Sequence, residues 1–326
     1  MNLLASVADT VLDRTIAPGY SRLGLAVRRR LPGWPADPPR IDGRTVAITG
    51  PTSGIGAAAA RDLAALGARV VLLARSPERA GATRRSIVDA VPGAAIDVVD
   101  CDVSSLASVR EAAAALREAG PLDALLHNAG VMPSAREETD EGLELAFATN
   151  VAGPFLLTAL LADHLADEAP GRLLTMSSGG MYGQALDVAD LQHAREPYKP
   201  AAVYARDKRA QVVLNALWAA RLRPAGVVCH ALHPGWADTP GVADALPGFR
   251  KATRRILRSP EEGADTLVWL AAAEEPTRST GRFWHDRRPR PTHLLPRTRE
   301  APEDRAELWR RVAAATGVDV PVPGAA

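Results

Sequence analysis

One tyrosine in this sequence has a partner that would change its acidity. Tyr204 is followed four positions later by Lys208, which is one of only three lysines in 326 residues. Residues four apart share a face of a helix. A free tyrosine has a pKa of about 10, and a fixed ammonium nearby favours the phenolate and lowers that pKa. The spacing predicts an acid/base unit, and the alternative is a surface tyrosine beside a solvated lysine.

A cluster of glycines earlier in the chain has the composition of a phosphate-binding turn. The stretch "TGPTSGIG" places Gly50, Gly54 and Gly56 between an apolar run and a helix-like segment. Backbone N–H groups at a helix N-terminus bind phosphate, and side chains there would block its approach. The spacing Gly-x-x-x-Gly-x-Gly differs from the Gly-x-Gly-x-x-Gly fingerprint. It indicates nucleotide binding, and the alternative is an ordinary turn between a strand and a helix.

The next apolar run ends in an arginine, in the sequence Ala74-Arg75-Ser76. Enzymes that select NAD place Asp or Glu at this position, where it accepts from the ribose 2′-OH. Here no carboxylate would repel a 2′-phosphate, and a guanidinium can pair with a phosphate bidentately. We therefore expect a preference for NADP(H) over NAD(H). The alternative is that Arg75 is a solvated strand end.

Alternating strands and helices would position these residues. The apolar runs predict strands over 45–49, 69–74, 95–100, 122–127, 172–177, 226–232 and 281–285. The helical patterns cover 54–66, 77–90, 105–119, 138–168, 201–222 and 260–273. Continuous apolar strands indicate burial on both faces, so the expected fold is α/β, with a three-layer, doubly wound parallel sheet.

Composition limits the alternatives. The net charge is +1 with 47% hydrophobic residues, which gives no general attraction to nucleic acid. No run of about 20 apolar residues predicts a membrane span. Cys101 and Cys229 lie in or beside apolar runs, and without a CxxC or a His/Cys cluster we expect no disulfide and no metal site. These features favour a reducing, cytoplasmic setting.

Several motifs together resemble one known family. "TGPTSGIG", "HNAG", "TNVAGPF", "TMSSGG", "YARDK" and "HPGWADT" occur in the order found in the short-chain dehydrogenase/reductase family. Within it, "SSGGMY" and "YARDKRAQV" are similar to the branch called dehydrogenase/reductase family member twelve, near the retinol dehydrogenase-like enzymes. The resemblance implies a Rossmann-type fold and an NADP(H)-dependent oxidoreductase acting on a carbonyl or alcohol carbon. The alternative is an NADP(H)-binding sensor without turnover.

The resemblance also implies the site residues. The catalytic group would be Asn150, Ser178, Tyr204 and Lys208. Ser178 would bond the substrate oxygen, with Ser177 as its rival, Asn150 would hold a proton-relaying water, and Lys208 would hold the nicotinamide ribose. Besides Tyr204 and Lys208, the cofactor residues would be Gly50, Thr52, Ser53, Gly54, Ile55, Gly56, Arg75, Asp102, Val103, Asn128, Ala129, Gly130, Pro234, Gly235 and Thr239. Asp207 departs from the family, in which serine is commoner.

The remaining segments suggest how the domain is organised. Residues 1–40 are predicted as an amphipathic helix ending at Pro18 and a proline-rich linker, 41–300 as the catalytic domain, and 301–326 as a C-terminal helix and tail. The first helix could pack on the core or lie on a membrane surface. The basic stretch 250–258 is either a solvated helix face or a contact for anionic lipid or an acidic substrate. The sequence allows a homo-oligomer.

A long segment between Ser178 and Tyr204 bears on the substrate. Residues 179–203 carry Met181, Tyr182, Leu186, Val188 and Tyr198 and follow the carboxyl end of a strand, where open sheets bind ligands. We expect them to form one wall of an apolar pocket, with Trp236, Val242, Leu246 and Phe249 forming the other. The alternative is that the segment packs against another subunit or the N-terminal segment.

Overall fold

The computed structural model describes residues 3–167, 170–195 and 197–323. Its centre is an eight-stranded sheet with the order β3-β2-β1-β4-β5-β6-β7-β8. The strands are β1 (Thr45–Thr49), β2 (Arg69–Ala74), β3 (Ile96–Asp100), β4 (Ala124–His127), β5 (Arg172–Met176), β6 (Val228–Leu232), β7 (Arg282–His285) and β8 (Arg288–Arg290). The first seven are parallel and β8 is antiparallel to β7. The α/β, doubly wound prediction is confirmed.

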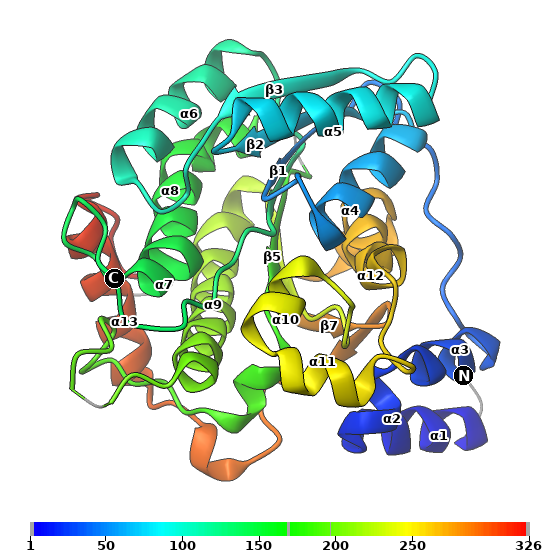
Figure 1. Ribbon diagram of the computed structural model, residues 1–326. Coiled ribbons are helices and arrows are strands. Elements are labelled where there is room, and N and C mark those ends of the chain that lie inside the picture. Colours follow the sequence, from blue (N-terminus) through cyan, green and yellow to red (C-terminus); the bar gives the residue numbers. More distant parts are fainter. Residues whose placement is uncertain (1–2, 168–169, 196, 324–326) are drawn as a thin grey trace.

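Helices cover both faces of this sheet (Figure 1). The N-terminal helices are α1 (Leu3–Arg14), α2 (Ile16–Tyr20) and α3 (Arg22–Arg30). One face of the sheet carries α4 (Gly54–Ala65), α5 (Pro77–Ala90) and α12 (Pro260–Ala272). The other carries α6 (Leu106–Glu118), α8 (Gly153–Ala166) and α9 (Pro200–Leu222), with α13 (Pro302–Thr316) packed outside them. The short helices are α7 (Leu145–Phe147), α10 (Pro240–Ala245) and α11 (Pro247–Thr253).

Apolar strand residues bury both faces, as their continuous runs predict. In β1, for example, Ala47 lies in the core beneath α6, α8 and α9, and its neighbours Val46 and Ile48 lie in the core beneath α4 and α12. Cys101 and Cys229 are buried free thiols, consistent with their places in or beside apolar runs. Leu145–Ala166 has the length and composition of a membrane span, but most of it is buried inside the molecule.

Two boundary predictions are wrong, and one strand was not predicted. The first helix does not end at Pro18, because α2 runs through that residue. Proline is tolerated in a helix's first turn, where its missing N–H needs no partner. The helix predicted over 138–168 begins only at Leu145, since residues 138–144 form a turn closed by a bridge between Glu138 and Glu144. The unpredicted strand is β8, a three-residue edge strand with no recognisable pattern in the sequence.

Candidate active site

The glycine turn lies between β1 and α4, as predicted. Gly50 has a φ of +65°, a conformation that favours glycine, and a Cβ there would lie 2.9 Å from the Cα of Ala129. Asn128 closes the turn from the neighbouring strand β4, because its Nδ2 donates to the carbonyls of Thr49 at 3.0 Å and Gly50 at 3.1 Å. The Thr49 hydroxyl accepts from the N–H groups of Asn128 and Ala129. The loops that follow β1 and β4 are therefore held together at the point where the strand order reverses.

The other predicted cofactor residues follow neighbouring strands and so share the carboxyl edge of the sheet. Arg75 follows β2 and is exposed. Asp102 follows β3, where its carboxylate accepts from the N–H and hydroxyl of Ser104 at 2.9 and 2.6 Å. Thr239 caps α10 and approaches Gly54, so that a Cβ on Gly54 would lie 3.1 Å from the Thr239 methyl. Thr52, Ser53, Ile55, Gly56, Val103, Gly130, Pro234 and Gly235 lie in the same loops or at the start of α4.

Ser178, Tyr204 and Lys208 come together at the end of β5 and on α9. The Lys208 ammonium lies 5.2 Å from the Tyr204 ring centroid and donates to the Met176 carbonyl at 2.9 Å. The Ser178 side chain lies beside the Tyr204 phenol and favours the phenolate. Ser177 points elsewhere, because its hydroxyl donates to the Lys208 carbonyl at 2.8 Å and it is buried. The geometry therefore favours Ser178 over Ser177 as the serine beside the phenol.

The acidity of this group differs from the sequence expectation. Burial and the negative charge of Asp207 raise the pKa of Tyr204 to about 12, although the neighbouring Ser178 hydroxyl lowers it. The expectation that Lys208 would lower this pKa below that of a free tyrosine is therefore wrong for the protein without cofactor, because desolvation of the phenolate dominates. Burial also lowers the pKa of Lys208 to about 8, against the opposing effect of Asp207.

Asn150 lies in a single π-helical turn, Ala148–Ala152, directly before α8. Pro154 stands four residues later and has no N–H, so it cannot give the Asn150 carbonyl its α-helical donor. The side chain of Gln211 on α9 supplies one instead, from Nε2 at 2.6 Å. Gln211 was not predicted from the sequence, although Pro154, four positions after Asn150, indicates that the Asn150 carbonyl needs a donor from elsewhere.

Asn150 has protein partners at each polar group of its side chain. Its Oδ1 accepts from the N–H of Val131 at 3.0 Å, and its Nδ2 donates to the Val131 carbonyl at 3.1 Å and to Asp207 at 2.9 Å. Asp207, the residue that departs from the family pattern, is buried and also bonds the ring of His193 at 2.9 Å. The sequence analysis missed His193, and nothing in its local sequence marks it.

The residues present fit a nicotinamide cofactor. An ammonium has three donors, and among the described residues Lys208 spends one of them, on Met176. Gly130 faces the same space, because a Cβ there would lie 3.2 Å from Asn150 Oδ1 and 3.3 Å from Lys208 Nζ. The remaining donors of Lys208 could therefore hold ribose hydroxyls. Within residues 3–167, 170–195 and 197–323, no three His, Cys, Asp or Glu side chains group as metal ligands do.

Comparison with known proteins agrees with this arrangement. The short chain dehydrogenase family matches residues 44–247, which span the glycine turn, Ser178 and the Tyr204–Lys208 pair. The chain belongs to this family. It is 40% identical over 271 residues to dehydrogenase/reductase SDR family member 12 of Bos taurus, covering 82% of this chain and 85% of the relative. It is 33% identical over 295 residues to retinol dehydrogenase 13 of Homo sapiens, covering 86% and 87%.

Solved structures place this short-chain dehydrogenase among Rossmann-fold neighbours. A crystal structure of an uncharacterised protein from Mycobacterium paratuberculosis has a TM-score of 0.71 at 27% identity, covering 88% of this chain and 98% of the other. The Pseudomonas aeruginosa RhlG complex with NADP has a TM-score of 0.62 at 25% identity, covering 74% and 94%. A 3-ketoacyl-(acyl-carrier-protein) reductase from Brucella melitensis, complexed with NADH, has a TM-score of 0.59 at 26% identity, covering 74% of this chain and 96% of the other. The family thus binds either nicotinamide cofactor.

The prediction that residues 179–203 form one wall of an apolar substrate pocket is partly wrong. Met181 and Tyr182 are buried in a cluster with Tyr20 of the N-terminal segment and with Phe283, and the Tyr182 hydroxyl donates to the Pro291 carbonyl at 2.7 Å. The alternative, packing against the N-terminal segment, holds for these two residues. The N-terminal helices cover this side of the 179–203 segment, whereas the sequence predicted a wall of an open pocket there.

The rest of that segment packs elsewhere as well. Leu186 and Val188 pack against the core formed by α6, α8 and α9, and Tyr198 donates to Glu144 at 3.1 Å. The cavity beside the segment, about 260 Å³, is lined mainly by polar and charged side chains. An apolar wall built from residues 179–203 is therefore not what the fold provides.

Proposed function

We propose that this protein is an NADP(H)-dependent oxidoreductase that moves a hydride between the nicotinamide and a carbonyl or alcohol carbon of a lipophilic substrate. The observation that carries the proposal is the cluster of Ser178, Tyr204 and Lys208 beside the Gly130 loop, with Ser178 beside the phenol and the ammonium close to its ring. A sensor without turnover has no need of this cluster, so the catalytic function is favoured.

Each residue of the cluster has a distinct task in carbonyl reduction. When bound, NADPH supplies the hydride. Tyr204 donates the proton to the substrate oxygen, and its pKa of about 12 keeps the phenol protonated at neutral pH. Ser178 donates a second hydrogen bond to that oxygen and stabilises the charge that develops on it. Lys208 positions the ribose and favours the phenolate that remains after proton transfer.

The preference for NADP(H) is supported by arginines near the end of β2. Arg75 is exposed directly after the strand, and no carboxylate occupies that position. Arg79, one helical turn into α5, lines a surface depression of about 470 Å³ together with Thr52 and Gly54 of the glycine turn. Arg75 and Arg79 are thus two cations near the glycine turn that could pair with a 2′-phosphate, and only Arg75 was predicted from the sequence.

Arg75→Ala is expected to weaken NADPH binding by about 10- to 100-fold and NADH binding by less than about threefold. The reason is the loss of a charge-assisted bond, worth about 1.5–3 kcal/mol, to a phosphate that NADH lacks. Fluorescence titration of both reduced cofactors measures the effect. Arg85→Ala, an exposed arginine of α5 that does not line the depression, is the matched control. Equal weakening of the two cofactors by Arg75→Ala would contradict the NADP assignment.

The lipophilic substrate is supported by the loop that follows β6. Trp236, Val242, Leu246 and Phe249 are each partly exposed, although all are apolar. The rings of Trp236 and Phe249 lie edge to face, with centroids 5.0 Å apart. This loop contacts the glycine turn through Thr239, so it lies on the cofactor side of the sheet. A bulky apolar group on the substrate would cover these side chains.

Phe249→Ala is expected to lower kcat/KM for a long-chain aldehyde by about 10-fold or more, because an aromatic side chain buried by substrate contributes about 1.5–3 kcal/mol. A short aldehyde, which cannot reach the ring, should change by less than about threefold. Leu295→Ala, another exposed apolar side chain, serves as the control. If both aldehydes change equally, the loop does not recognise the substrate chain.

The direct test of the proposed function is consumption of NADPH with a panel of aldehydes and ketones. We expect turnover with lipophilic carbonyl compounds, and alcohol oxidation with NADP⁺. Binding of NADPH without turnover across the panel would favour the sensor and overturn the proposal.

A further inference from the structure

A buried carboxylate connects the proposed active site with a second polar cavity. Asp207 stands directly before Lys208 on α9 and is 3% exposed. One of its oxygens accepts from Asn150 Nδ2 at 2.9 Å, and the other bonds His193 Nε2 at 2.9 Å. A negative charge so close to the phenol opposes its ionisation, which contributes to the raised pKa of Tyr204.

The loop is built to present His193 to this carboxylate. His193 has a φ of +52°, an uncommon conformation for a residue other than glycine. Asp190 stabilises the turn, because its carboxylate accepts from the N–H groups of Ala194 and Arg195 at 2.8 and 3.0 Å. His193 is buried, with an exposed fraction of 5%. Its Nδ1 has no hydrogen-bond partner in the described part of the chain.

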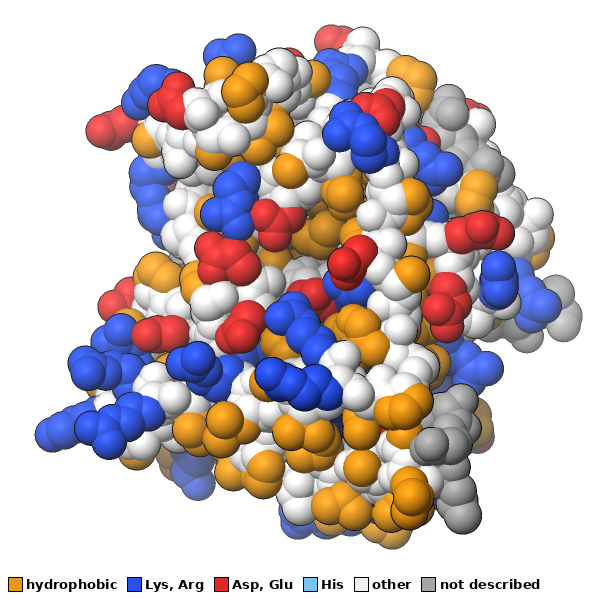
Figure 2. All heavy atoms as spheres, turned by 90° about the vertical axis from the view of Figure 1, so that its right-hand side faces the viewer, with side chains coloured by type: hydrophobic (Ala, Val, Ile, Leu, Met, Phe, Trp, Pro, Cys, Tyr) orange, Lys and Arg blue, Asp and Glu red, His pale blue; other side chains and the backbone are white. Residues whose placement is uncertain are grey.

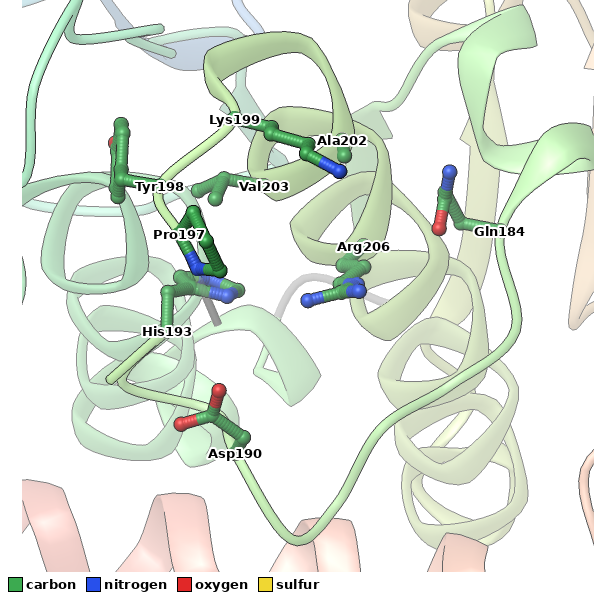
Figure 3. Close-up of a pocket in the computed structure, with 9 residues that line it drawn as sticks. All are labelled: Gln184, Asp190, His193, Pro197, Tyr198, Lys199, Ala202, Val203 and Arg206. Carbon is green, nitrogen blue, oxygen red and sulfur yellow. The ribbon is translucent and has the colours of Figure 1, made fainter. Parts of the chain in front are cut away.

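The cavity of about 260 Å³ beside the ring gives protons a place to enter. Figure 3 shows His193 and Arg206 pointing into it from opposite sides, with Asp190, Tyr198 and Lys199 around them. Glu144, from the start of α7, adds negative charge near the ring. Burial lowers the pKa of His193, but Asp207, Glu144 and Asp190 more than offset this, and the pKa lies above its ordinary value.

We infer that His193 is a positioning residue that sets the pH dependence of proton transfer at Tyr204 by gaining or losing a proton beside Asp207. This rests on the proposed function. Protonated His193 neutralises the carboxylate, so Tyr204 is the stronger acid. Neutral His193 leaves the carboxylate uncompensated, and Tyr204 then gives up its proton less readily. Lys208, the other charged neighbour of Asp207, is present in both states.

The test is the pH profile of carbonyl reduction at saturating NADPH. The wild type should lose about three- to tenfold in kcat in a step above pH 6.5, as His193 loses its proton. His193→Gln keeps a donor for Asp207 but carries no charge, so its rate should stay at the low level without the step. Asp207→Asn keeps the acceptor for Asn150 without the charge, so its rate should stay at the high level without the step.

One control variant and three contrary outcomes make the test decisive. His293→Gln, a histidine paired with Glu300 outside this cavity, should retain the wild-type step. A step that persists in His193→Gln, or variants that both fall to the same low rate, would overturn the inference while leaving the proposed function intact. Absence of turnover in the wild type would instead overturn the proposed function.

A separate observation concerns the outer face of the N-terminal helices. Of nine large hydrophobic side chains that are exposed in the described chain, six lie in α1–α3. They are Leu4, Val7, Val11, Ile16, Leu23 and Val27, with exposed fractions between 45% and 81%. Leu4, Val7 and Val11 share one face of α1 by their spacing, and Leu23 and Val27 share one face of α3. Figure 2 shows hydrophobic side chains gathered along the lower part of this side of the molecule.

The exposed charges on the same segment are all positive. Asp9 and Asp13 are buried, whereas Arg14, Arg22, Arg29 and Arg30 are exposed. The basic stretch 250–258 adjoins this segment, because the N–H of Arg22 donates to the carbonyl of Ile256 at 2.9 Å. Exposed apolar residues flanked only by cations match the surface of an anionic bilayer.

We propose that the outer face of α1–α3, together with residues 250–258, docks on an anionic lipid surface. The apolar side chains enter the interface and the arginines contact the headgroups. The same helices contact the active-site loop, since a Cβ on Gly179 would lie 2.6 Å from the Tyr20 ring. Docking would therefore bring the site next to the membrane.

The test is sedimentation of the full chain with vesicles of phosphatidylcholine alone or mixed with phosphatidylglycerol. We expect binding to the mixed vesicles that weakens with salt. Val7→Ser combined with Val11→Ser, and Arg254→Glu combined with Arg255→Glu, should each weaken it by at least about 10-fold. Val88→Ser with Val98→Ser, exposed valines elsewhere, is the matched control. Equal binding to neutral vesicles, no binding, or self-association that the Val7/Val11 variant abolishes would overturn the proposal.

Discussion

Tyr204→Phe is expected to lower kcat for carbonyl reduction by about 100- to 10,000-fold, the usual contribution of a positioned general acid. The phenyl ring still fills its place beside Lys208, but the hydroxyl beside Ser178 that can donate a proton is gone. NADPH affinity should stay within about threefold, because the glycine turn, Lys208 and the other predicted cofactor residues remain. Stopped-flow or steady-state reduction, with a fluorescence titration of NADPH, measures both quantities.

Tyr182→Phe is the matched control for this variant. It also removes one phenolic hydroxyl, but that hydroxyl donates to the Pro291 carbonyl. We expect Tyr182→Phe to keep kcat within about threefold. If Tyr204→Phe keeps more than about a tenth of the wild-type kcat, a loss below about 1.4 kcal/mol, Tyr204 is not the acid.

Asp286→Ala is expected to lower the free energy of unfolding by about 3–5 kcal/mol, the cost of breaking a buried ion pair. Asp286 is 1% exposed and its carboxylate accepts from Arg258 at 2.6 and 3.0 Å and from Arg28 at 2.6 Å. Arg28 also bonds Asp9 at 3.0 Å, so the network fastens the N-terminal helices to the turn after β7. Without Asp286, the buried Arg258 guanidinium loses its carboxylate partner and the buried Arg28 keeps only Asp9.

Chemical denaturation measures this loss, and Asp42→Ala is the control. Asp42 pairs with Arg40 on the surface, where both side chains are well exposed, so its loss should cost less than about 1 kcal/mol. Burial alone would raise the pKa of Asp286, yet Arg258 and Arg28 hold it well below its ordinary value. The stabilisation is therefore complete above the unfolded pKa of about 3.9 and is lost as the pH falls below it. Similar losses for the two variants would contradict the role of the network.

Local spacing in the sequence determined the fold class and the place of the main site. Apolar runs that alternate with helical patterns specify a parallel sheet with two buried faces, because each element's periodicity depends only on near neighbours in the chain. The glycines at 50, 54 and 56 and the Tyr204–Lys208 pair could be identified for the same reason. A turn and one helical face are local geometries, so residue type and spacing suffice to predict them.

Only the tertiary structure decided the environment of these residues. Ser177 and Ser178 are adjacent in sequence, and their separation follows from the packing of β5 against α9. The raised pKa of Tyr204 depends on burial and on Asp207, which spacing does not reveal. His193 reaches Asp207 from a loop, and Tyr20 reaches the Met181–Tyr182 segment from a helix outside the predicted domain. Desolvation and contacts between distant segments are properties of the packed molecule, and for that reason no local pattern could predict them.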